Sequence, residues 1–185
     1  MSHLTEQAIQ ASLLRLLNEK PLDKITVREI ADDCGINRNT FYYHYHDIFD
    51  LLEKMFAKEE ERLLSEIQDV TTLQQGFMQA THFAMENYQA IYHAYNSVSR
   101  DSLTRYLYNA ASISMRKYIL GQCDKDNMPS DRDLEDLIFL FASMIEGAII
   151  NVMREGLTRD VENLIDNAIR LMEGTVRLAI DNCNS

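Results

Sequence analysis

The sequence predicts an all-α protein in which an N-terminal three-helix domain with a helix-turn-helix is followed by a C-terminal helical bundle. Two observations support this fold class. Two capping residues, Thr26 and Asn37, lie only eleven positions apart, which forces a tight turn between two helices. Beyond residue 70, no stretch shows the β-branched alternation that is typical of strands. We therefore predict an N-terminal domain over residues 1–50 and a helical domain over residues 51–185.

The composition is that of a soluble globular protein, since 46% of the 185 residues are hydrophobic and 25% are charged. No apolar run approaches the roughly eighteen residues of a membrane span, and the N-terminus shows no signal sequence, so we expect a cytoplasmic chain. The three cysteines, Cys34, Cys123 and Cys183, have no CxxC spacing. This pattern favours reduced thiols over disulfides or a zinc site.

The first helix is predicted to begin at a Thr5 cap and to end at Pro21, because proline cannot continue a helix. Its apolar residues recur at helical spacing, and they are Ile9, Leu13, Leu16 and Leu17. One face of this helix should therefore be buried.

The helix-turn-helix is predicted from its caps. Thr26 and Glu29 form a capping box that begins one helix, and Gly35 ends that helix in the left-handed conformation. Asn37 caps the next helix at once. Hydrogen-bonding side chains fill the first two turns of this second helix, and they are Arg38, Asn39, Thr40, Tyr42, Tyr43 and His44. A helix of this kind is suited to the major groove of DNA.

At these residues the chain resembles the TetR family of transcriptional regulators. The family signature is matched over about the first fifty residues by Thr26, Ile30, Ala31, Gly35, Ile36, Asn37, Thr40, Tyr42, His44, Tyr45 and Leu51. The resemblance implies a DNA-binding regulator that forms a dimer through a four-helix interface. One position departs from the signature: the lysine that typically meets a phosphate just after the second helix is Ile48 here.

The predicted DNA contacts fall into two groups. Arg38, Asn39, Thr40 and Tyr43 are expected to read base edges or the adjacent sugar-phosphate, whereas Thr26, Arg28, Tyr42 and His44 are expected to hold phosphates. The resemblance gives His44 its phosphate role. With the cap residue, the full predicted set is Thr26, Arg28, Asn37, Arg38, Asn39, Thr40, Tyr42, Tyr43 and His44.

The net charge of −11 is the observation least favourable to a nucleic-acid partner, because Lys and Arg normally neutralise phosphates. Residues 1–55 carry six Lys or Arg against nine Asp or Glu. The position of each charge matters more than the sum. Arg28 and Arg38 lie at helix N-termini, whose free amides and dipole add positive potential.

The remainder of the chain is predicted to be helical throughout. Asp47 should cap a fourth helix that continues to about Glu66, and Asp50 lies in its first turn. Further helices are expected near residues 72–94, 100–121, 131–155 and 159–182. The loop before the helix at 131 ends in a cap, and Gly156 precedes the last helix.

The last two helices carry apolar stripes with coiled-coil spacing and further apolar residues beside them, which indicates helices that pack on more than one side. We predict that they form the dimer interface through Phe141, Ile145, Ile149, Leu164, Ala168, Leu171 and Met172. The alternative is that these stripes form the core of a monomer.

A ligand pocket is predicted between residues 77 and 118, where aromatic residues and methionines with polar tips gather. Its predicted members are Phe77, Tyr88, Tyr92, His93, Tyr95, Met115 and Tyr118. Such a pocket would take a small, largely apolar effector. The alternative is ordinary core packing of the same side chains.

The sequence offers no catalytic pattern, since no histidine follows a glutamate by three positions and no nucleophile triad, phosphate loop or HExxH occurs. We therefore expect no enzyme, cofactor or metal site. The favoured hypothesis is a homodimeric repressor that binds a palindromic DNA operator and responds to a small molecule. The alternative is a co-regulator with the same fold that acts mainly through a protein partner.

Overall fold

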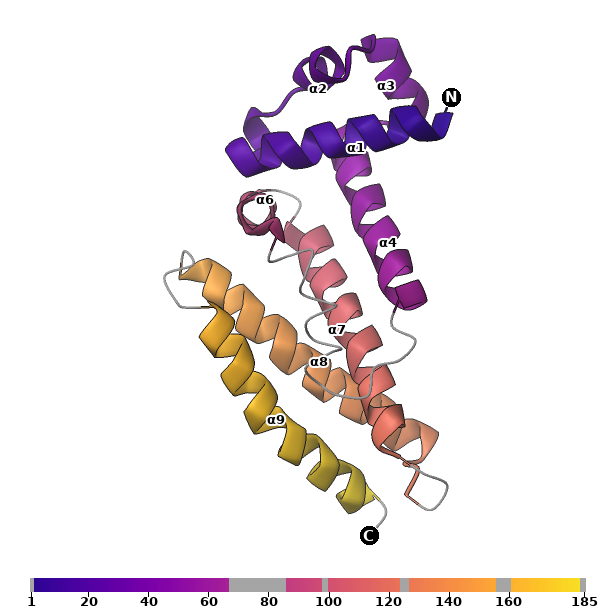
Figure 1. Cartoon of the computed structure of the whole chain (residues 1–185), viewed down its shortest axis with the longest axis vertical. Coiled ribbons are helices and arrows are strands. Elements are labelled where there is room, and N and C mark those ends of the chain that lie inside the picture. Colours follow the sequence, from indigo (N-terminus) through magenta and orange to yellow (C-terminus); the bar gives the residue numbers. More distant parts are fainter. Residues whose placement is uncertain (1, 67–85, 98–99, 124–126, 156–160, 184–185) are drawn as a thin grey trace. The chain divides into compact units, whose positions relative to one another are not determined.

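The computed structural model describes residues 2–66, 86–97, 100–123, 127–155 and 161–183 (Figure 1). The described elements are α1 Ser2–Glu19, the 3-10 turn η1 Leu22–Lys24, α2 Val27–Cys34, α3 Arg38–His44, α4 Ile48–Glu66, α6 Tyr88–Tyr95, α7 Arg100–Gln122, α8 Asp131–Arg154 and α9 Val161–Cys183. Within these residues all regular structure is helical, which confirms the predicted fold class.

The chain divides into two compact units. The first unit comprises residues 1–59 and 84–106, and the second comprises residues 60–83 and 107–185. Helices α4 and α7 each begin in the first unit and end in the second. The domain boundary predicted at residue 50 remains a prediction.

The core of the first unit forms around α1. Ile9, Leu13 and Leu17 lie on one face of this helix and are fully buried, as their spacing predicts. Phe41 from α3 is buried in the same unit. Helix α1 begins at Ser2, so the predicted cap at Thr5 is wrong, whereas the predicted end before Pro21 is confirmed.

The caps of the helix-turn-helix form as predicted. The Glu29 amide donates to Thr26 Oγ1 at 3.2 Å, and the Thr26 amide donates to Glu29 Oε2 at 2.9 Å. Gly35 has φ 65° and ψ 30°, and the amide of Ile36 returns to the Ala31 carbonyl at 2.9 Å, which closes a Schellman turn. Asn37 then caps α3 by accepting the Asn39 amide at 2.6 Å.

Helix α4 begins at the predicted cap. Asp47 Oδ1 accepts the Asp50 amide at 2.8 Å, and Asp50 Oδ2 accepts the His46 amide at 2.8 Å. Lys54 then donates to Asp50 Oδ2 at 2.9 Å and to the His44 carbonyl at 3.2 Å. Because the His44 carbonyl ends α3, this lysine fixes the end of α3 to α4 and complements the helix dipole.

Helix α6 packs against α1 within the first unit, and Figure 1 shows it nearly end-on beneath α1. Its Ala90 amide donates to Asn18 Oδ1 at 3.3 Å, and His93 Nδ1 lies 2.6 Å from the Leu17 carbonyl. The uninterrupted helix predicted over 72–94 is wrong at its end, because α6 begins only after Asn87. The earlier part of that prediction, up to residue 85, lies outside the described residues.

The second unit contains α8, α9 and most of α7, which are long helices predicted from the sequence. The bounds of α7, α8 and α9 agree with the predictions at 100–121, 131–155 and 159–182 to within two residues. Ser130 caps α8 by accepting the Asp133 amide at 3.2 Å. The predicted stop at Gly156 lies outside the described residues.

Helix α8 is long and apolar enough to cross a membrane by length and composition alone, with a mean hydropathy of 1.7 over eighteen residues. This differs from the expectation that no stretch reaches that limit. The physical reason is that α8 is apolar on two sides. A core helix of a globular domain has the same composition, and Leu134, Ile138 and Phe141 are indeed buried.

We predict that Gly35→Ala lowers the free energy of unfolding by about 1–2 kcal/mol, because a Cβ disfavours the left-handed backbone. A Cβ at this position would meet no atom within 4 Å, so backbone strain is the whole expected effect. Gly35→Asn is the control and should lose less, since asparagine tolerates this conformation. Urea unfolding measures the stability of both variants. Equal stability of the alanine variant and the wild type would contradict the left-handed conformation of Gly35.

Candidate nucleic-acid interface

Helix α3 presents a polar face to solvent. Arg38 and Asn39 are exposed, and the side chains of Tyr42 and Tyr43 are 55% and 83% exposed. Phe41 is buried and anchors the opposite face, with its ring centroid 5.7 Å from that of Tyr45. The structure therefore brings most of the predicted base-reading side chains onto one accessible surface, with Thr40 partly buried beside them.

Two predicted contact residues already serve as helix caps. The Thr26 hydroxyl accepts the Glu29 amide and donates to Glu29 Oε2 at 3.0 Å. Asn37 Oδ1 accepts the Asn39 amide. Capping is therefore the role that the structure gives these side chains, and their contacts with DNA remain predictions.

His44, which is predicted to hold a phosphate, contacts α1 in the structure. The His44 side chain is only 6% exposed, and its Nδ1 lies 3.1 Å from Glu6 Oε1 on α1. The seven-residue helix turns this side chain inward, toward α1, whereas Tyr42 and Tyr43 turn outward. A phosphate contact by His44 would need this side chain to leave Glu6, and it remains a prediction.

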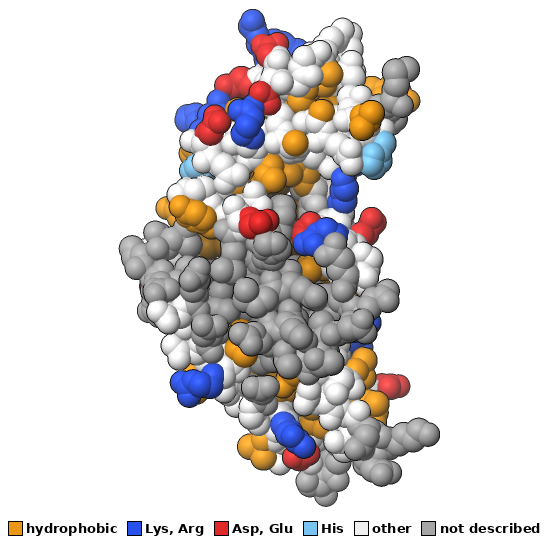
Figure 2. Space-filling model, viewed as in Figure 1, with side chains coloured by type: hydrophobic (Ala, Val, Ile, Leu, Met, Phe, Trp, Pro, Cys, Tyr) orange, Lys and Arg blue, Asp and Glu red, His pale blue; other side chains and the backbone are white. Residues whose placement is uncertain are grey.

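Nearly every cation of the helix-turn-helix region is paired with a carboxylate of the same region. Figure 2 shows Lys and Arg side chains next to Asp and Glu side chains on this surface. The pairs are Arg15 with Asp33, Lys20 with Glu29, Lys24 with Asp23, Arg28 with Asp32 and Lys54 with Asp50. Arg38 forms no ion pair with any described residue, so it is the cation most available to a nucleic acid.

Hydrogen bonds to two of these carboxylates alter their titration. The Lys20 ammonium, followed by the Thr26 hydroxyl and amide, lowers the pKa of Glu29 below its usual value. The His46 amide, followed by Lys54, lowers the pKa of Asp50 in the same way. Both carboxylates therefore stay charged, and their partners stay engaged, at neutral pH.

The described members of the predicted pocket set are divided between the two units. Met115 and Tyr118 are buried in the core of the second unit. In the first unit, Tyr95 is buried with the Arg100 guanidinium 4.6 Å from its ring centroid, and His93 contacts the α1 carbonyl. Tyr88 is half exposed, Tyr92 is partly buried, and Phe77 lies outside the described residues. These positions favour the alternative of ordinary packing.

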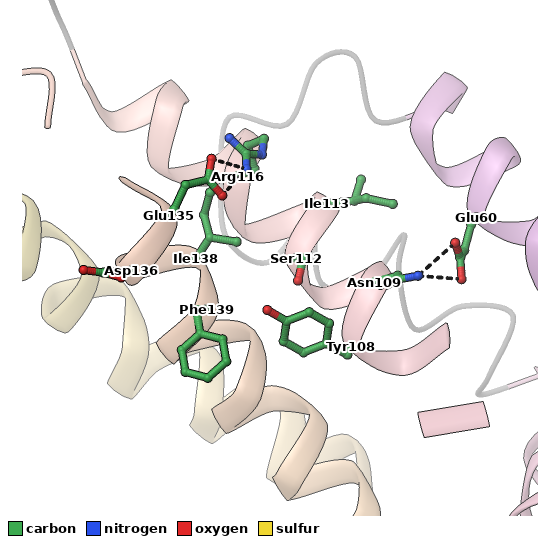
Figure 3. Close-up of a pocket in the computed structure, with 10 residues that line it drawn as sticks. All are labelled: Glu60, Tyr108, Asn109, Ser112, Ile113, Arg116, Glu135, Asp136, Ile138 and Phe139. Carbon is green, nitrogen blue, oxygen red and sulfur yellow. Dashed lines mark hydrogen bonds and ion pairs between the residues drawn. The ribbon is translucent and has the colours of Figure 1, made fainter. Parts of the chain in front are cut away.

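A cleft of about 510 Å³ lies instead in the second unit, between α7, α8 and the end of α4 (Figure 3). Its lining residues are Glu60, Tyr108, Asn109, Ser112, Ile113, Arg116, Glu135, Asp136, Ile138 and Phe139. Sequence reasoning missed this cleft. The available signal was the polar row Tyr108, Ser112 and Arg116, which recurs every four residues along one face of α7.

The predicted dimer-interface residues are only partly accessible. Phe141 and Ile145 are 5% and 6% exposed in the single chain, so most of each side chain is covered by its own chain, and their place in a dimer interface remains a prediction. Leu171 is exposed, Ile149, Ala168 and Met172 are partly buried, and the Leu164 side chain lies outside the described residues. The apolar spacing identifies helices with two apolar sides but does not tell which side faces inward.

Comparison with known proteins gives matches to both units. Residues 9–55 match the family model described as bacterial regulatory proteins, tetR family, and residues 71–174 match the model described as transcriptional regulator C-terminal region. The uncharacterized HTH-type transcriptional regulator YxbF of Bacillus subtilis (strain 168) is 30% identical over 63 residues. That stretch is 34% of this chain and only 17% of that protein.

A solved structure resembles the whole fold. The dihydroxyacetone kinase operon activator DhaS superposes with a TM-score of 0.78 over 94% of this chain and 97% of that one, at 18% sequence identity. At this identity the likeness shows the fold alone.

We predict that the capping box weakens in acid. Because the pKa of Glu29 is lowered in the folded state, its contribution to stability is present above the ordinary glutamate pKa and is lost as the pH falls through the folded-state value. Glu29→Gln should therefore be less stable than the wild type at pH 7, and the difference should shrink in acid.

Urea unfolding at several pH values measures this difference. Glu61→Gln is the matched control, because Glu61 is exposed on α4 and has no partner among the described residues. A Glu29→Gln deficit that is the same at every pH would show that the charge of Glu29 is unimportant.

Proposed function

The chain belongs to the TetR family of transcriptional regulators, and we propose that it binds palindromic operator DNA as a homodimer and represses transcription. The observation that carries this proposal is the helix-turn-helix, whose second helix exposes a polar face. We assign DNA binding to residues 1–50, and effector binding and dimerisation to residues 51–185. Members of this family are typically soluble and cytoplasmic, and we propose the same location here.

In this proposal α3 enters the major groove. Arg38 and Asn39 are exposed at its N-terminal end, where side chains of a recognition helix reach base edges. Tyr43 lies one turn further along and is the most exposed aromatic side chain among the described residues. Arg28 and Tyr42 are assigned to phosphates, and Arg28 must leave its 3.5 Å pair with Asp32 to reach one.

The proposed dimer uses the solvent-facing side of α8 and α9. Leu140, Met144 and Ala148 are exposed at four-residue spacing on α8. On α9, Leu171 and Leu178 are exposed on either side of Gly174 and Thr175. Large apolar residues around small ones allow helices to approach closely, so this surface is suited to a four-helix interface with a second copy.

A two-fold dimer would set the geometry of the operator. Two copies of α3 related by a two-fold axis read the same bases on opposite strands, which requires a palindrome. The half-sites should lie about one helical turn, or a multiple of it, apart.

The alternative function is a co-regulator that works mainly through a protein partner. Its support is the paired cations of the helix-turn-helix region and the hydrophobic Ile48 at the family's lysine position. The structural neighbour DhaS is named an operon activator, so activation is the second alternative to repression. A reporter gene under the control of the DNA upstream of this protein's gene distinguishes repression from activation.

We predict that Arg38→Ala weakens operator binding by about 5- to 150-fold, equivalent to about 1–3 kcal/mol, and relaxes the preference at one base pair, because a bidentate contact with guanine is lost. Fluorescence anisotropy with DNA from upstream of the gene measures the affinity. Lys117→Ala, which removes an exposed cation from α7 outside the helix-turn-helix and the proposed interface, is the matched control and should bind like the wild type.

An unchanged affinity and selectivity in Arg38→Ala would mean that α3 is not the reading helix. Absence of upstream DNA binding by the wild type, even at low salt, would favour the co-regulator.

We predict that Met144→Glu separates the dimer into folded monomers. Met144 is 56% exposed in the single chain, so a charge there harms only an interface with another copy. Leu64→Glu is the matched control, since Leu64 is 55% exposed on α4 and lies outside the proposed interface. Sedimentation velocity with circular dichroism measures both; a wild-type monomer at micromolar concentration would contradict the dimer.

A further inference from the structure

We propose that the cleft between α7 and α8 binds a small amphipathic amine, and that this amine is the effector. The inference rests on the proposed function as a ligand-responsive regulator and names the chemistry of its ligand. The volume of about 510 Å³ is within the range of small-molecule sites. All ten lining residues belong to the second unit.

Two hydroxyl groups of the cleft have no hydrogen-bond partner among the described residues. Ser112 Oγ is fully buried without a hydrogen bond to any described residue, and the Tyr108 hydroxyl has none either. Figure 3 shows both hydroxyl groups on the side of α7 that faces Phe139. A buried hydroxyl without a partner is unfavourable, so a ligand with a hydrogen-bonding group gains by satisfying it.

The charges of the lining favour a cation. Three carboxylates, those of Glu60, Glu135 and Asp136, stand against the single guanidinium of Arg116. One Arg116 nitrogen lies 2.7 Å from each oxygen of Glu135, which leaves further lone pairs on this carboxylate for a ligand N–H. An anionic ligand would meet an excess of negative charge, whereas an ammonium group would reduce it.

The apolar part of the cleft suits a ring or a branched chain. The Tyr108 and Phe139 rings lie 6.4 Å apart at 61°, and Ile113 and Ile138 complete the wall. The Phe139 side chain is 57% exposed, so a ligand can still cover it. An ammonium group near the face of an aromatic ring is attracted by the ring quadrupole.

The helices that hold the ligand continue into the first unit. Tyr108, Ser112 and Arg116 lie on α7, whose first residues belong to the unit that contains α2 and α3. Glu60 of α4 accepts both of its 3.1 Å hydrogen bonds from Asn109 of α7, which joins the two helices at the cleft. An amine that prefers one arrangement of α4 and α7 would therefore shift the balance between DNA-binding states.

The test uses three probes with the same body and different charge: 2-phenylethylammonium, 2-phenylethanol and 3-phenylpropanoate. Isothermal titration calorimetry with the full chain should show the ammonium binding at least about tenfold more tightly than the other two, because only it donates charge-assisted hydrogen bonds. Glu135→Gln, Ser112→Ala and Phe139→Ala should each weaken it by about three- to tenfold. Glu61→Gln and Phe49→Ala are the matched controls, on exposed residues of α4 outside the cleft.

Two results would overturn the proposal: no binding of the ammonium at millimolar concentration, or equal or tighter binding of the carboxylate. A bound ammonium that leaves operator affinity unchanged would overturn its role as effector, since about a 5- to 150-fold change is expected of an effector. The affinity of the wild type for the operator, measured without the amine, tests the proposed function independently of the ligand. Without the amine, Glu135→Gln should bind the operator like the wild type. If the wild type does not bind the operator, the proposed function as a DNA-binding regulator is wrong.

Discussion

The left-handed backbone of Gly35 is the constraint on which the helix-turn-helix depends. It lets the Ile36 amide return to Ala31, so the chain leaves α2 and enters α3 without an intervening loop. The direction of α3 then places Phe41 in the core and turns the polar side chains of the same helix outward. One backbone conformation thus determines which side chains can reach a partner.

Lys54 stabilises the other end of the same motif. Its ammonium contacts the terminal carbonyl of α3, the Asp50 carboxylate at the start of α4 and, at 5.1 Å, the Tyr45 ring. These contacts tie the second helix of the motif to the helix that continues into the second unit. They also occupy a cation on α4, the helix whose first residue, Ile48, stands where the family usually has its phosphate-binding lysine.

Structural features could be predicted from the sequence where the interaction that determines them is local. Thr26, Gly35, Asn37 and Asp47 were assigned correctly because a cap depends on atoms within four residues of itself. The burial of His44 and Ile145 could not be predicted in the same way, because their exposure depends on which distant helix covers them. The cleft was missed for the same reason: the polar row on α7 becomes a site only when Glu135 and Phe139 of α8 lie opposite it.

The paired cations explain how an acidic chain can be suited to specific DNA recognition. Non-specific affinity comes almost entirely from Lys and Arg that neutralise phosphates, and here most such groups already have a carboxylate partner. On α3, Arg38 has no ion-pair partner among the described residues, and the other exposed polar side chains carry neutral amide and hydroxyl groups, whose hydrogen bonds depend on the base they meet. Such a surface has little general attraction to DNA and retains discrimination between bases. In the proposed dimer, binding by both copies of α3 would then have to supply the affinity for an operator.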